Sequence, residues 1–205
     1  MTVTTRKPRA DTVGNTHAEP RLAVLVSGSG RSLDNLIRLH RDGRLAALPA
    51  LVVASRQCAA LEIARDNDIN AELIPAFESP AQLEALLSHH RIDLVALAGY
   101  LKHLPVPKAF AGRILNIHPA LLPRHGGPGM FGHRVHQAVL DAGDSESGCT
   151  VHEVTDIYDA GPIIAQARCP VLQDDTPSSL ARRVFELEKE LYPRVINERA
   201  GAIAP

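Results

Sequence analysis

The chain has 205 residues, of which 45% are apolar and 22% charged, and its formal net charge is −1. This is the composition of a globular protein with a sizeable core, and it excludes a disordered chain. The near-neutral charge argues against a nucleic-acid or polybasic membrane-binding protein, and no apolar run reaches the roughly 18 to 20 residues of a membrane span.

Residues 1–20 contain no apolar stretch, so they are predicted to be a flexible tail rather than a secretory signal. From residue 21 onward the chain shows no repeat and no internal linker, which predicts one catalytic domain over 21–205. Short apolar runs alternate there with segments of helical periodicity. Strands are expected near 22–26, 50–54, 71–75, 92–97 and 114–117, and helices at 31–42, 58–68 and 81–90.

The last third of the chain predicts a short helix at 133–142, strands near 150–154 and 162–167, and a long closing helix at 177–198. Continuously apolar strands that alternate with helices are typical of an α/β fold. The expected architecture is an open, mostly parallel twisted sheet with helices on both faces, which is Rossmann-like. Such sheets bind ligands beyond the carboxyl ends of their strands, so we expect the chemistry at strand ends.

A glycine-rich segment, Ser27-Gly-Ser-Gly-Arg-Ser32, follows the first strand and opens the first helix. Glycines let the backbone approach a ligand, and a helix N-terminus offers free N–H groups, so a phosphate fits there. The segment is not a P-loop, because no Gly-Lys-Ser/Thr follows, and the third glycine of the dinucleotide fingerprint is missing. A plain strand-to-helix turn is the alternative.

Asn116 and His118 lie at the end of the fifth expected strand. They are two residues apart and therefore point the same way, just before Pro119 ends the strand. An amide can hold a carbonyl oxygen while an imidazole gives or takes a proton, which indicates carbonyl chemistry. A structural pair at a strand end is the alternative.

Asp159 lies in a turn between two expected strands, with Gly161 two residues later. A carboxylate near His118 would raise the pKa of the imidazole and favour its charged form. The alternative is a hairpin turn that uses Asp and Gly for its backbone shape alone.

Other candidates have less support. His125, His133 and His136 suggest a metal site, but no acidic or thiol ligand accompanies them at matching spacing, so no metal is expected. The three cysteines are widely spaced without a CxxC pair, which favours a reducing, cytoplasmic location. The glycine-rich stretch 126–132 is either a mobile cover over the site or a surface loop.

Taken together, these segments resemble the folate-dependent formyltransferase family, over residues 21–193. The resemblance rests on Ser27-Gly-Ser-Gly-Arg-Ser-Leu33, Leu97-Ala-Gly-Tyr-Leu-Lys102, Asn116-Ile-His-Pro-Ala-Leu-Leu-Pro123 and Gly148-Cys-Thr-Val-His-Glu-Val-Thr-Asp-Ile-Tyr-Asp-Ala-Gly-Pro162. It implies that the formyl group of the co-substrate 10-formyltetrahydrofolate is transferred to the amine of 5-phosphoribosylglycinamide. The products would be 5-phosphoribosyl-N-formylglycinamide and tetrahydrofolate, in de novo purine (IMP) biosynthesis, made by a monomer or homodimer without a metal.

The resemblance also implies roles for individual residues. His118 would be the catalytic proton donor, Asn116 would hold the formyl oxygen, and Asp159 would tune the imidazole. The residues implied to bind the substrate are Gly30, Arg31 and Ser32 for its phosphate and Glu188 for its amine, although Glu188 can also be read as an exposed helical residue. The residues implied to bind folate are Leu101, Lys102, His103, Leu104, Asn116, Thr155, Asp156, Ile157, Tyr158 and Asp159.

Two alternative functions stay open. A formyltetrahydrofolate deformylase shares the Asn, His and Asp and would hydrolyse the same formyl group, although its extra N-terminal regulatory domain is not expected here. A non-catalytic nucleotide-binding module would bind without turnover, and it would not need all three residues together.

Overall fold

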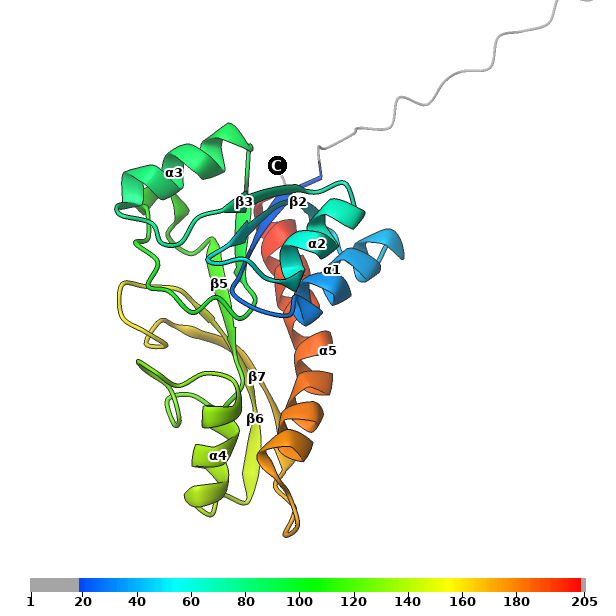
Figure 1. Ribbon diagram of the computed structural model, residues 1–205, viewed down its shortest axis with the longest axis vertical. Coiled ribbons are helices and arrows are strands. Elements are labelled where there is room, and N and C mark those ends of the chain that lie inside the picture. Colours follow the sequence, from blue (N-terminus) through cyan, green and yellow to red (C-terminus); the bar gives the residue numbers. More distant parts are fainter. Residues whose placement is uncertain (1–18, 204–205) are drawn as a thin grey trace, which may run out of the picture.

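A single twisted sheet of seven strands, in the order β3-β2-β1-β4-β5-β6-β7, forms the centre of the molecule (Figure 1). The structure, a computed structural model, describes residues 19–203, so the predicted tail at 1–20 lies almost wholly outside the described residues. Strands β1 to β5 pair in parallel, β6 pairs antiparallel with β5, and β7 pairs antiparallel with β6. The predicted fold class is confirmed.

The boundaries of the elements lie within a few residues of most of the predicted ones. The strands are β1 (Arg21–Val26), β2 (Leu48–Ala54), β3 (Asn70–Leu73), β4 (Leu94–Leu97), β5 (Ile114–His118), β6 (Glu146–Glu153) and β7 (Ile163–Pro170). The helices are α1 (Arg31–Arg41), α2 (Ala59–Asp66), α3 (Pro80–His89), α4 (His133–Asp141) and α5 (Pro177–Ile203), with a 3-10 turn, η1 (Lys108–Phe110).

The central strands are apolar throughout because both faces of the sheet are covered. In β1, Val24 and Val26 belong to a core shared with α1, α2 and α5, whereas Ala23 and Leu25 belong to a core shared with α3. This alternation follows from the period of two along a strand. Figure 1 shows α1, α2 and α5 on one side of the sheet and α3 on the other.

Strand β3 differs from its prediction. The apolar run near 71–75 predicts a buried strand, but all four residues of β3 are exposed, because it is the edge strand and pairs only with β2. Its polar residues suit an edge, where polar side chains discourage pairing with another chain.

Helix α5 is attached to the two neighbouring strands β4 and β5. The hydroxyl of Tyr192, which is 2% exposed, lies 3.0 Å from both the Leu97 and the Leu115 carbonyl oxygens. It therefore connects α5 to the last residue of β4 and to the first half of β5. In the described part of the chain, no helix has the length and apolarity that crossing a membrane requires.

Candidate active site

A cavity of about 520 Å³ opens at the carboxyl ends of β1, β4 and β5, where an open α/β sheet is expected to bind its ligand. The glycine-rich loop before α1 lines it, as do the segments that follow β4 and β6. The predicted site residues that line it are Gly30, Arg31, Ser32, Leu101, Lys102, His103, Leu104, Asn116, His118, Thr155, Ile157, Tyr158, Asp159 and Glu188. Asp156 does not belong to this lining. It is exposed, and its carbonyl accepts a hydrogen bond from His103 Nε2 at 3.0 Å.

The start of α1 offers backbone N–H groups to this cavity, since no side chain caps the helix at Gly30. Gly30 has φ +74, and a Cβ there would lie 2.8 Å from Ile63 Cδ1 and 3.0 Å from Ala60. The glycine is therefore required for the packing of α1 on α2, not only for the approach of a ligand. Gly28 also lines the cavity, and a Cβ there would meet nothing within 4 Å.

Glu188 and Arg31 bring charge to the same region. The Arg31 guanidinium lies over the Phe185 ring, 4.2 Å from its centre. Burial raises the pKa of Glu188 to about 7, against the opposing effect of the Arg31 charge. Glu188 is thus a partly buried carboxyl group that changes its charge near neutral pH, rather than a solvated helical residue.

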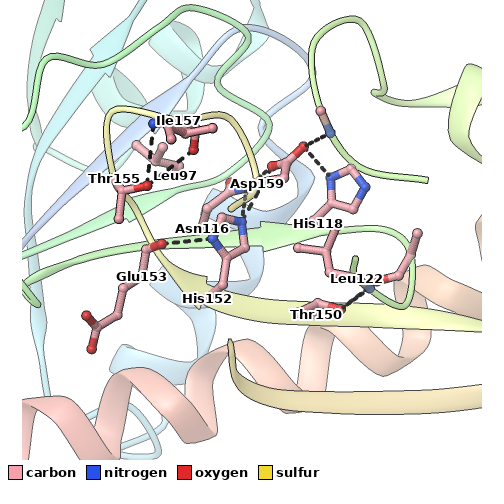
Figure 2. A network of polar contacts seen from close by, with 12 residues as sticks. Leu97, Asn116, His118, Leu122, Thr150, His152, Glu153, Thr155, Ile157 and Asp159 are labelled. Atoms are coloured by element: carbon pink, nitrogen blue, oxygen red, sulfur yellow. Dashed lines mark hydrogen bonds and ion pairs between the residues drawn. The ribbon is translucent and has the colours of Figure 1, made fainter. Parts of the chain in front are cut away.

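Asn116 is held by a residue with no sequence signal of its own, His152. The antiparallel register of β5 and β6 places His152 opposite Asn116, and Asn116 Nδ2 lies 3.0 Å from His152 Nε2 (Figure 2). His152 Nδ1 lies 2.9 Å from the Glu153 carbonyl oxygen. A carbonyl only accepts, so Nδ1 carries the proton and Nε2 accepts from the amide. This contact fixes which end of the Asn116 amide faces β6.

Asp159 lies at the meeting point of the polar side chains (Figure 2). Its Oδ2 accepts from the Gly127 N–H at 2.9 Å and lies 3.6 Å from His118 Nδ1. Its Oδ1 lies 3.5 Å from His152 Nε2 and 3.4 Å from Asn116 Nδ2. The carboxylate is 11% exposed, and the residue has φ +53. Asp residues adopt this left-handed conformation more readily than most others.

Asp159 has the predicted effect on the pKa of His118, but this effect does not decide the net shift. Burial lowers the pKa of His118 and outweighs the Asp159 carboxylate, which raises it. Burial alone would raise the pKa of Asp159, but its polar neighbours, among them the charge of His118 and the Gly127 N–H, bring it below its usual value. The free protein at neutral pH therefore pairs an ionised Asp159 with a His118 that is mostly neutral.

The histidines considered as metal ligands have other surroundings. His125 pairs with Asp144, and burial together with His133 and His118 lowers the pKa of His136 to about 4. Across residues 19–203, no group of His, Cys, Asp and Glu is arranged to hold a metal ion. Both His136 and the loop residues Gly127 to Gly132 line the cavity.

Comparison with known proteins gives one consistent family. The formyl transferase family model matches residues 20–196. The chloroplastic phosphoribosylglycinamide formyltransferase of Arabidopsis thaliana is 42% identical over 200 residues, which are 91% of this chain and 68% of that protein. The phosphoribosylglycinamide formyltransferase of Escherichia coli is 36% identical over 86% of this chain and 85% of its own length. The crystal structure of glycinamide ribonucleotide transformylase 1 from Symbiobacterium toebii superposes with a TM-score of 0.81 at 38% identity, covering 89% of this chain and 88% of that one.

Proposed function

Because the chain belongs to the formyl transferase family, we propose that it transfers the formyl group of 10-formyltetrahydrofolate to the amine of 5-phosphoribosylglycinamide, in purine biosynthesis. This proposal rests on the residues that line one cavity. The Asn116, His118 and Asp159 side chains meet in it, and the N-terminus of α1 opens into it. A carbonyl-activating group and an anion-binding helix end thus share one space.

The wall of the cavity fits a flat heterocycle. Leu101 and Leu104 line it after β4, and Ile157 and Tyr158, which are 69% and 41% exposed, line it after β6. Such a mixture of apolar side chains and a few polar groups is typical of small-molecule sites. When bound there, 10-formyltetrahydrofolate would supply the formyl group, and we assign these four residues to its binding.

Asn116 would bind the formyl carbonyl oxygen, and His118 with Asp159 would handle the proton that is transferred during the reaction. The amide nitrogen of Asn116 contacts both His152 and Asp159. The contact with Asp159, at 3.4 Å, is the longer of the two, so this N–H is the one more easily turned toward a carbonyl oxygen of the substrate. Negative charge that develops on that oxygen would favour the charged form of His118, and Asp159 would stabilise this form. His118, neutral in the free protein, would take up the proton that the attacking substrate amine releases and donate it to the folate nitrogen whose bond to the formyl carbon breaks.

The proposal is tested by following the folate product spectrophotometrically, with and without 5-phosphoribosylglycinamide. We expect product only when the ribonucleotide is present. Equal product formation without it would show a deformylase instead, and binding of both ligands without turnover would show a binding module. A cytoplasmic location stays a prediction, and the Arabidopsis relative is named chloroplastic.

The phosphate end is tested by Gly28→Val. The new side chain would have room in the folded protein but would project into open space beside the loop that we assign to phosphate. We expect KM for the ribonucleotide to rise by at least about tenfold, since one charge-assisted hydrogen bond is worth roughly 1.5 to 3 kcal/mol. The folate KM should stay within about twofold. Gly201→Val, another open glycine position on α5, is the control. An unchanged ribonucleotide KM would remove the loop from the site.

Glu188 predicts a pH dependence. As its carboxyl group ionises through a pKa of about 7, ribonucleotide affinity should rise roughly tenfold from pH 6 to pH 8, because the carboxylate binds the substrate amine better than the acid does. In Glu188→Gln this pH-dependent rise in ribonucleotide affinity should be lost, as measured by calorimetric titration. Titration of the substrate phosphate affects wild type and Glu188→Gln alike, so the difference between their pH profiles reports Glu188. Glu186→Gln, exposed on the same helix, is the control. Parallel profiles for wild type and Glu188→Gln would contradict the assignment.

A further inference from the structure

A hydrogen-bonded pair behind His118, formed by His125 and Asp144, has no part in the chemistry above. His125 Nε2 lies 2.7 Å from Asp144 Oδ2, and the two side chains are only 14% and 11% exposed. The other oxygen of Asp144 pairs with Arg124, which is 63% exposed. Asp144 follows α4, and its N–H donates to the Val139 carbonyl at 3.3 Å. The carboxylate is therefore attached to the end of a helix, and it holds the His125 ring from outside the cavity.

The backbone of His125 faces the opposite way, toward the site. His118 Nε2 lies 2.8 Å from the His125 carbonyl oxygen. Because a carbonyl only accepts, Nε2 must carry the proton, and Nδ1 is left to face the Asp159 carboxylate. The hydrogen bond made by one ring nitrogen decides which form of a neutral histidine is present. The position of the His125 carbonyl thus selects the tautomer of neutral His118, with the proton on Nε2.

The carbonyl is presented by an uncommon backbone conformation. His125 has φ +56, in the left-handed region that few residues other than glycine adopt. Conformations of this kind persist only when the surrounding structure holds them. The ring of His125 supplies such a hold, because its half-buried hydrogen bond with Asp144 attaches the residue at the position where its carbonyl reaches His118.

We propose that His125 is a positioning residue, whose hydrogen bond with Asp144 holds its carbonyl against His118 and keeps the His118 imidazole in the tautomer protonated at Nε2. The kinetic consequence rests on the proposed function, whereas the effect on the His118 ring concerns the free protein and can be measured without substrate. His125 acts through His118 and is not assigned a contact with substrate.

Two variants break the pair from its two sides. His125→Asn keeps a residue that tolerates the left-handed conformation but has a shorter side chain, and Asp144→Ala removes the carboxylate. We expect each to lower kcat by about 10- to 100-fold, the size of effect that a misplaced catalytic group produces, with both KM values within about twofold. Arg124→Gln is the matched control, since it removes the exposed partner of Asp144 and leaves the pair with His125 in place.

The decisive measurement is ¹⁵N NMR of the histidine rings without substrate, with the His118 signals identified by their loss in His118→Gln. Wild type and Arg124→Gln should show His118 protonated at Nε2 above its pKa, and the two pair-breaking variants should show a mixture of both neutral forms. Thermal unfolding checks that each variant is folded.

Several outcomes would overturn the proposal. One is an unchanged His118 tautomer in both pair-breaking variants. Another is an equal loss of kcat in Arg124→Gln, which would indicate general loosening of the loop. A changed His118 tautomer with an unchanged kcat would also overturn the positioning role of His125. If the wild type formylates no ribonucleotide, the proposed function fails by itself, and the NMR comparison still decides whether the pair controls the His118 ring.

Discussion

His118→Gln should lower kcat for formyl transfer by about 10²- to 10⁴-fold, the usual contribution of a positioned acid or base, with both KM values changed by only a few fold. The reason is the location of His118 at the end of β5, where it is 3% exposed and lies 3.6 Å from the Asp159 carboxylate. Glutamine keeps a hydrogen-bonding side chain of similar length but cannot carry the proton. Steady-state kinetics at saturating concentrations of both substrates measure the effect.

His89→Gln, at the end of α3, is the control for loss of any histidine. If His118→Gln instead raised both KM values and left kcat near that of wild type, His118 would be a binding residue and the proton-donor assignment would be wrong.

Much of the fold could be predicted from the sequence because its signals are local. Apolar runs such as that of β1 mark strands buried on both faces, and the helical segments between them require a parallel sheet. Asn116 and His118 could be placed on one side of a strand for the same reason, since the period of two needs no knowledge of neighbours. The exposure of β3 could not be foreseen, because it depends on which strand has no partner on its outer side.

The candidate site was less predictable wherever it depends on contacts between distant segments. His152 reaches Asn116 only through the antiparallel register of β5 and β6, which neither strand encodes alone. The net pKa shift of His118 depends on how completely the fold buries the ring, whereas the sequence indicates only its charged neighbour. The need for glycine at position 30 comes from α2, which packs against it.

Asp159→Asn should also lower kcat by orders of magnitude, although it keeps the size of the side chain and a residue that tolerates φ +53. The lost charge is the one that raises the pKa of His118, so the pKa, already lowered by burial, should fall further. The limb of the kcat–pH profile that reports His118 should therefore move to lower pH. The ribonucleotide KM should stay near that of wild type, because the N-terminus of α1 is unaltered. The measurements are kcat against pH for both proteins and an NMR titration of His118.

Asp156→Asn is the matched control for this change. It removes the same charge from the same turn, but Asp156 is exposed and does not line the cavity. Its kcat and its pH profile should match those of wild type, since solvent screens a charge that faces outward. An Asp159→Asn variant with near-normal kcat and an unmoved His118 pKa would make Asp159 a turn residue only. Equal losses in the two variants would point to the shape of the turn rather than to the carboxylate beside His118.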